Sequence, residues 1–267
     1  MTNNLKSFHG LTAVPFSKLI GTQHLFQCSS HNELIARLEM ALAMDDLALV
    51  TGASGTGKSS ALRRFIDALD STTHPWVYIT ADRYKIGDLC KQILHGLKIT
   101  PPFHTYAAMN RLKQEIEKKH REKNAKPVII IDEAQELPPE TLLSMKNLTN
   151  YEMDSQPKLL IILSGHNDLT AILGMLRYES LSRRIRIRCR VEQLTLEETS
   201  RYITHQLDKC GSRKPIFAEE SVARIFTLTQ GNISQINNIC LQSLILSASE
   251  SQPIVGPAII EKVAQGI

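Results

Sequence analysis

The chain has 267 residues, of which 42% are hydrophobic and 22% are charged, a composition typical of one large or two modest globular domains. It contains no apolar run of the roughly 18 to 20 residues that span a bilayer, and residues 1–16 lack the blocks of a signal peptide. We therefore expect a cytoplasmic protein with no membrane part. The formal charge of +4 and the pI near 8.8 stay below the range, above about 9, that points to a nucleic-acid-binding domain.

The first two-thirds of the chain alternates short apolar runs with helix-length amphipathic segments. The runs are residues 47–50, 76–79, 128–131, 159–163 and 185–191. Runs that are apolar throughout are typical of parallel strands buried under helices on both faces of a sheet. We expect an α/β fold in which helices sandwich a parallel five-stranded sheet.

Strand patterns stop after about Val191, and the remainder is predicted to be helical. The expected helices are residues 196–208, behind the cap residue Thr195, and then 218–229, 233–248 and 256–265. This change from alternating strands and helices to helices alone predicts a domain boundary near residue 193. We expect an N-terminal segment (1–28), an α/β core (29–192) and a small all-helical domain (193–267). The five cysteines are scattered without a C-x-x-C pair, which favours reduced structural thiols.

A glycine-rich phosphate-binding motif follows the first predicted strand. Gly52, Ala53, Ser54, Gly55, Thr56, Gly57, Lys58 and Ser59 satisfy G-x-x-x-x-G-K-[ST] at every fixed position, and a helix is predicted over 58–69. In such a loop successive backbone N–H groups point at phosphate oxygens, next to the positive end of the helix. Lys58 is expected to reach the β- and γ-phosphates and Ser59 to ligate Mg²⁺, with Ser60 completing the nucleotide-binding residues. A glycine-rich turn without a ligand is the alternative, which the strand before it and the helix after it disfavour.

A second motif places two carboxylates at the end of a buried strand. Val128–Ile131 is followed by Asp132 and Glu133, at the strand end where α/β folds bind ligands. Asp132 is expected in the Mg²⁺ shell, and Glu133 is placed to polarise a water for attack on the γ-phosphate. No N-K-x-D guanine-binding pattern is present, so ATP is the expected nucleotide. In the chain, the predicted strand 76–79 lies between the two motifs.

The next predicted strand also ends in polar residues. Ser164 and His166 follow Leu159–Leu163, where either could bind the attacking water or the γ-phosphate. The alternative is that Ser164 only satisfies local backbone groups.

Arginines and lysines form two clusters. Arg183 and Arg184 lie between a predicted helix and a strand, from which a guanidinium could reach a neighbouring subunit's γ-phosphate; a solvated surface pair is the alternative. Arg184, Arg186, Arg188 and Arg190 are expected to share one face of an exposed edge strand, and the alternative is a groove for nucleic acid. Residues 111–126 predict a helix with a basic outer face, which serves solubility or, alternatively, binds DNA phosphates with little sequence preference.

Together these motifs resemble the ExeA-like ATPases over nearly the whole chain. Residues 8–16 resemble the F-x-G-L-x-x-x-P-F opening of that family, and the match continues through the segments 31–34, 52–59, 131–135, 164–166, 184–185 and 194–199. The resemblance implies a P-loop NTPase of the AAA+ class with a helical lid. It further implies that Pro15 and Phe16 help to wall the adenine pocket, and that Arg184, with Arg183 beside it, is an arginine finger that reaches the nucleotide of a neighbouring subunit in a ring or filament of identical subunits.

One departure from the family lies in the lid. The family pattern G-G-x-P-R-x-I-N carries a nucleotide-sensing arginine, and Ser234 stands at that place here. Ile236 and Asn237 are retained. The substitution predicts weak turnover, or a site used mainly as a nucleotide-gated clamp that binds ATP and barely hydrolyses it.

Two functions are associated with this family. Secretion-type members continue past the lid into a membrane span, whereas the sequence ends at Ile267, so we expect no membrane anchor here. Short members resemble the transposition ATPases of the TnsC, TniB and IstB kind. We therefore expect an ATP-hydrolysing regulator that oligomerises on duplex DNA and recruits or activates a transposase. The alternative is an ATPase that powers assembly of a secretion or envelope complex through another protein partner.

Overall fold

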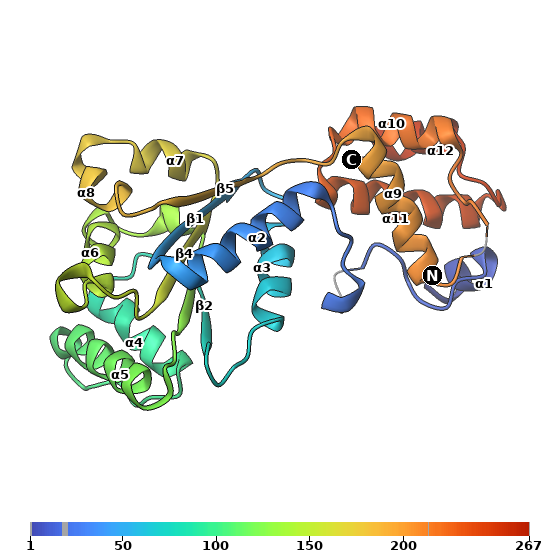
Figure 1. Ribbon diagram of the computed structural model, residues 1–267. Helices are drawn as coiled ribbons and strands as arrows, with labels where there is room; N and C mark the ends of the chain where they lie inside the picture. The colour runs from blue at the N-terminus through green and yellow to red at the C-terminus, as the bar shows by residue number, and fades with distance from the viewer. Residues whose placement is uncertain (1, 18–20, 213, 267) are drawn as a thin grey trace. The chain divides into compact units, whose positions relative to one another are not determined.

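The computed structural model describes residues 2–17, 21–212 and 214–266 (Figure 1). The described chain divides into two compact units. One is an α/β unit of residues 30–53 and 61–191, and the other is a helical unit of the residues up to Ser29, Ser54–Ser60 and the residues from Glu192 onward.

The α/β unit contains the parallel five-stranded sheet that the sequence predicts. Its strands are β1 (Leu47–Gly52), β2 (Trp76–Thr80), β3 (Val128–Asp132), β4 (Leu160–Gly165) and β5 (Ile187–Val191). They lie in the order β2-β3-β4-β1-β5, and every pairing is parallel. The strand between β1 and β3 in space is therefore β4, and β2 lies at an edge. β5 begins two residues later than expected, so Arg184 and Arg186 precede the strand and do not share a strand face with Arg188 and Arg190.

Helices cover both faces of this sheet, because its central strands are apolar on both sides. The helices α2 (Ser29–Met44) and α3 (Lys58–Asp67) pack on one face. On the other face lie α4 (Ile86–Gly96), α5 (Ala108–Lys123), α6 (Pro139–Thr149), α7 (Asp168–Leu173) and α8 (Glu179–Ser182). The edge strand β2 is covered on one side only: Val77 and Ile79 are buried, whereas Trp76 and Tyr78 are partly exposed.

The helical unit packs around α11 (Ile233–Ser249). Its other C-terminal helices are α9 (Leu196–Lys209), α10 (Glu219–Thr229) and α12 (Pro257–Gln265). Thr195 begins α9 with a capping box, in which its hydroxyl accepts from Glu198 N and the Glu198 carboxylate accepts from Thr195 N.

The N-terminal residues also belong to this unit. The helix α1 (Thr2–His9) packs against α11 through buried Leu5, and the His9 ring lies 3.0 Å from the Ser247 hydroxyl. Phe16 is buried in the same apolar core, with its ring edge-on to Phe217. Leu5 and Phe16 thus join the N-terminal residues to the core of the helical unit.

All five cysteines are buried and none forms a disulfide. Among the described residues, no helix combines the length and the apolarity that crossing a membrane requires.

Candidate nucleotide site

The phosphate loop connects β1, which ends at Gly52, to α3, which begins at Lys58. Gly55 and Gly57 have φ angles of +80° and +92°, in the left-handed region that side chains with a Cβ disfavour. The loop glycines therefore allow the chain to reverse direction within a few residues. Lys58 is only 7% exposed.

The N-terminus of α11 contacts the same loop. The Asn232 amide donates to the Ser54 carbonyl at 2.7 Å, and Ser234 N donates to the Gly55 carbonyl at 3.2 Å. The Asn232 oxygen accepts from Gln235 N at 3.2 Å and so caps α11. Ser234, which stands where the family resemblance expects a sensor arginine, thus contacts the loop through its backbone.

The Gly55→Ala variant is expected to lose at least about tenfold in nucleotide affinity, ~1.4 kcal/mol, while remaining folded. A Cβ at Gly55 would lie 2.4 Å from Asn232 Oδ1 and 2.8 Å from the Ser234 Cβ, so the loop must shift. Gly10→Ala is the matched control, because Gly10 also has a positive φ (+67°) but meets nothing within 4 Å. Titration calorimetry with ATP tests both variants, and wild-type affinity in Gly55→Ala would contradict this account of the loop.

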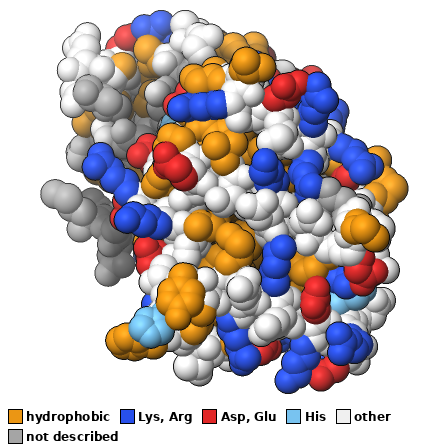
Figure 2. Space-filling model, turned by 90° about the vertical axis from the view of Figure 1, so that its left-hand side faces the viewer, with side chains coloured by type: hydrophobic (Ala, Val, Ile, Leu, Met, Phe, Trp, Pro, Cys, Tyr) orange, Lys and Arg blue, Asp and Glu red, His pale blue; other side chains and the backbone are white. Residues whose placement is uncertain are grey.

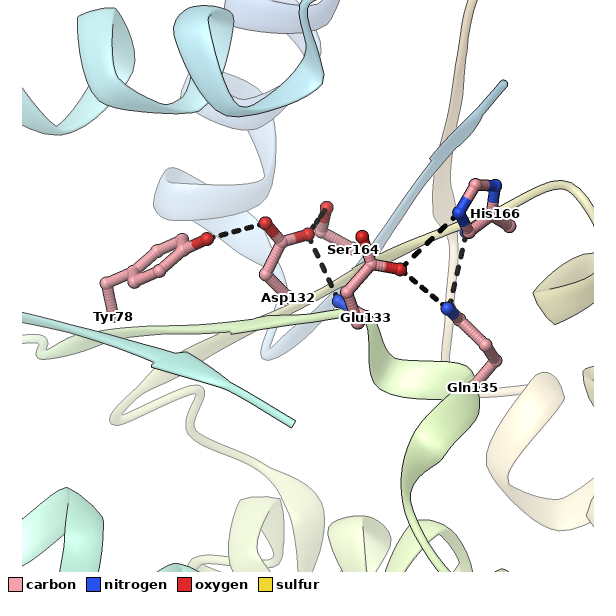
Figure 3. A network of polar contacts seen from close by, with 6 residues as sticks. All are labelled: Tyr78, Asp132, Glu133, Gln135, Ser164 and His166. Atoms are coloured by element: carbon pink, nitrogen blue, oxygen red, sulfur yellow. Dashed lines mark hydrogen bonds and ion pairs between the residues drawn. The ribbon is translucent and has the colours of Figure 1, made fainter. Parts of the chain in front are cut away.

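A network of polar contacts surrounds the end of β3 (Figure 3). Asp132 is 5% exposed. Its Oδ1 accepts from the Ser164 hydroxyl at 2.7 Å and from Glu133 N at 3.1 Å, and its Oδ2 accepts from the Tyr78 hydroxyl at 2.6 Å. Burial and this bond raise the pKa of Tyr78 to about 12, so its hydroxyl remains a proton donor at neutral pH.

Glu133 lies beside this network but is more open to solvent. Its φ of +54° turns the chain out of the strand, and its side chain is 40% exposed. Gln135 Nε2 donates to Glu133 Oε2 at 2.6 Å, and His166 Nε2 lies 3.7 Å from the same oxygen (Figure 3). A carboxylate held from one side and exposed on the other can accept a proton from a water molecule.

The backbone of β4 helps to place Gln135. The Gln135 amide oxygen accepts from His166 N at 3.3 Å. A Cβ on Gly165 would lie 2.3 Å from that oxygen, so only glycine leaves Gln135 room there.

The structure thus brings four of the predicted residues together at adjacent strand ends: Asp132, Glu133, Ser164 and His166. Ser164 bonds to the Asp132 carboxylate, which neither of its two predicted roles included. Sequence reasoning assigned no role to Tyr78 or Gln135. The only signal for Tyr78 was its position on a strand, two residues before Thr80, which pairs with Asp132.

The two candidate finger arginines differ in their surroundings. Arg184 Nη1 donates to the Lys146 carbonyl and to the Thr149 hydroxyl at the end of α6. The Arg183 side chain is 77% exposed and pairs with Glu179 one turn earlier. It lines an open hollow of about 360 Å³ that Leu173 and Leu176 also line.

Fewer lysine and arginine side chains on and after α5 are exposed without a partner than the sequence predicts. Lys126 lies beyond the helix and is buried, where Nζ donates to the carbonyls of Leu42 and Asp45, and burial lowers its pKa to about 8. Lys113 donates to the Asn150 carbonyl, and Arg111 pairs with Glu115. The expectation of a basic outer face is therefore wrong for Lys126, and the exposed cations for which no ion pair or hydrogen bond is described are Lys118, Arg121 and Lys123.

The residues expected to hold magnesium have suitable chemistry. Mg²⁺ prefers hard oxygen donors and is commonly held by one or two carboxylates, waters and substrate phosphates. Asp132 offers a carboxylate fixed by hydroxyl donors, and Ser59 offers a hydroxyl. The described residues contain no cluster of three or more His, Cys, Asp or Glu that could hold a metal ion.

Two sequence comparisons show which proteins the chain is similar to. Residues 44–173 match the protein-family model described as "AAA domain". The chain is also 28% identical over 243 residues to general secretion pathway protein A of Aeromonas hydrophila. The match covers 89% of this chain but 44% of that protein, so the chain spans less than half the length of this curated relative.

Solved structures of low sequence identity share the fold. Cdc6p from Pyrobaculum aerophilum superposes with a TM-score of 0.75 at 17% identity, over 98% of this chain and 71% of that one. The Drosophila ORC, solved bound to DNA, gives a TM-score of 0.67 at 15% identity, over 98% of this chain and 64% of that one. The chain therefore shares the fold of these two structures, a parallel sheet between helices followed by a helical C-terminal region.

Proposed function

We propose that this chain binds ATP with Mg²⁺ and hydrolyses it to ADP and phosphate. The observation that carries the proposal is the pair of carboxylates after β3, one buried and held by hydroxyls and the other partly exposed. The strand β1, which leads into the phosphate motif, ends at the same edge of the same parallel sheet. Such an edge is where α/β proteins bind their ligands.

The proposed roles follow from the chemistry of each group. The backbone N–H groups of residues 52–60 and the Lys58 ammonium bind the phosphates. Ser59 and Asp132 hold Mg²⁺, which neutralises phosphate charge when bound. Glu133 accepts a proton from the attacking water, and its oxygen Oε2 is oriented by Gln135 and faces His166. Pro15 and Phe16 remain our proposal for the adenine pocket, and both are buried.

We propose that hydrolysis requires a second copy of the chain, which supplies Arg184. Arg184 must then leave Lys146 and Thr149, whereas Arg183 needs only to leave an exposed ion pair. Arg184→Ala is expected to lower kcat at least about tenfold at protein concentrations that allow assembly. Arg183→Ala is the comparison variant. If Arg184→Ala lowers the melting temperature but keeps the kcat, then its role is confined to α6 and the finger assignment fails.

We also propose duplex DNA as the surface on which the oligomer assembles, with a transposase as the protein that it recruits. Exposed Lys118, Arg121 and Lys123 on and near the end of α5 support contact with phosphates. On the face shown in Figure 2, however, Lys and Arg side chains are interspersed with Asp and Glu. The expected binding is therefore weak, without sequence preference, and strongly dependent on salt.

The similarity to general secretion pathway protein A favours a second candidate function. In that function the ATPase powers assembly of a secretion or envelope complex through a protein partner, and DNA has no part.

Sedimentation with random-sequence duplex DNA at moderate salt separates the two functions. The first function predicts ATP-dependent co-sedimentation with DNA, which Lys58→Ala abolishes. It also predicts that DNA affinity depends less on salt concentration after Lys118, Arg121 and Lys123 are replaced by glutamine. Equal sedimentation with and without DNA would exclude the first function and leave the second. Both share the ATPase proposal, which a separate measurement of phosphate release tests.

A further inference from the structure

Tyr78 has an unusual environment for a tyrosine on an edge strand. A tyrosine commonly buries its ring and leaves its hydroxyl in water. Here 43% of the residue is exposed, yet its hydroxyl bonds to a carboxylate that is 5% exposed. The hydroxyl of this partly exposed residue is therefore directed at a buried acid.

The register of the sheet explains how Tyr78 reaches Asp132. Thr80 of β2 pairs with Asp132 of β3, so Tyr78, two residues earlier, lies on the same face as Asp132 and diagonal to it. Ser164 follows Leu163 of β4, which pairs with Ile131, and therefore flanks Asp132 from the other side. The two strands that neighbour β3 each contribute one hydroxyl to the same carboxylate.

These contacts fix the orientation of the Asp132 carboxylate. Oδ1 accepts two bonds, from Ser164 and from Glu133 N, whereas Oδ2 accepts the bond from Tyr78 (Figure 3). Rotation of the carboxylate about its Cβ–Cγ bond would break bonds on both oxygens at once. Removing Tyr78's hydroxyl would leave Oδ2 without that restraint.

We propose that Tyr78 is a positioning residue, which orients Asp132 toward the Mg²⁺ that accompanies the nucleotide. This inference rests on the proposed ATPase function. It predicts that the Tyr78 hydroxyl affects the contribution of Mg²⁺ to nucleotide binding and leaves binding without Mg²⁺ unchanged. Partners of this kind commonly change metal affinity about ten- to a hundredfold when they are removed.

Titration calorimetry with a non-hydrolysable ATP analogue, at a series of Mg²⁺ concentrations and in EDTA, tests the proposal. For Tyr78→Phe the Mg²⁺ concentration at half-maximal binding is expected to rise about tenfold or more, with unchanged affinity in EDTA. Tyr106→Phe is the matched control, because Tyr106 is 83% exposed and its ring stacks on that of His104. It is expected to behave as wild type.

A double-mutant cycle distinguishes positioning from a general structural effect. In an Asp132→Asn background, Tyr78→Phe is expected to cause no further change in the Mg²⁺ requirement. Fluorescence of Trp76, the single tryptophan of the chain, monitors folding of each variant on the same strand. A wild-type Mg²⁺ requirement in Tyr78→Phe, or an equal loss of affinity with and without Mg²⁺, would overturn the proposal while the ATPase function stands. A wild-type chain whose nucleotide binding ignores Mg²⁺ would overturn both.

Discussion

The Glu133→Gln variant is expected to bind ATP with wild-type affinity but to hydrolyse it at least about a hundredfold more slowly. General bases commonly contribute a factor of 10² to 10⁴, and a glutamine amide cannot accept a proton from water at neutral pH. The amide has nearly the same shape as the carboxylate, so the contact with Gln135 can be kept by a flipped side chain. Phosphate release under single-turnover conditions measures the chemical step.

Glu136→Gln is the control for this experiment. Glu136 lies three residues further along the chain and is exposed. The variant therefore removes the same charge as Glu133→Gln but leaves the contacts of Glu133 with Gln135 and His166 in place. Turnover in Glu133→Gln that remains within about threefold of wild type would remove Glu133 from the mechanism. If turnover is already very low in wild type and does not fall in the variant, the chain is a nucleotide-binding clamp, as Ser234 in place of a sensor arginine predicts.

Replacing Lys58 by alanine is expected to weaken ATP binding by about 10- to 150-fold and to abolish hydrolysis. Hydrogen bonds that involve a charged group contribute about 1.5–3 kcal/mol, which corresponds to that range of affinity. Lys58 is 7% exposed, so solvent cannot replace its charge near a bound phosphate. The affinity is measured by titration calorimetry and the fold by thermal denaturation.

Lys123→Ala removes an equal charge from the exposed end of α5 and serves as the control. It should leave both affinity and melting temperature unchanged. Tight ATP binding by Lys58→Ala would show that the glycine-rich loop is not the phosphate site.

The sheet was predictable because its central strands are apolar on both faces. The runs around Leu49, Ile130 and Ile162 leave no polar face for solvent, and all three residues are buried. The start of β5 was placed too early, since Ile185 is buried like a strand residue although it precedes the strand. The burial of Leu5 and Phe16 against the helical unit could not be inferred, because neither lies in a periodic pattern that specifies a partner.

The carboxylates could be recognised from sequence because strand ends and motif spacing are local features. The partners of these groups could not, because Tyr78, Ser164 and Gln135 meet them only through the register and the backbone geometry of β2, β3 and β4. Charge clusters were misleading for the same reason. Lys126 and Arg184 use their donors on carbonyl and hydroxyl oxygens far away in the chain.

We propose above that this chain hydrolyses ATP through its phosphate motif and the acids after β3. Steady-state phosphate release from ATP by wild type, with Mg²⁺ and with EDTA, tests it most directly, with Lys58→Ala prepared in parallel. Wild type is expected to release phosphate only with Mg²⁺, and Lys58→Ala is expected to release none. Equal release by wild type and Lys58→Ala, or none above background in either, would contradict it.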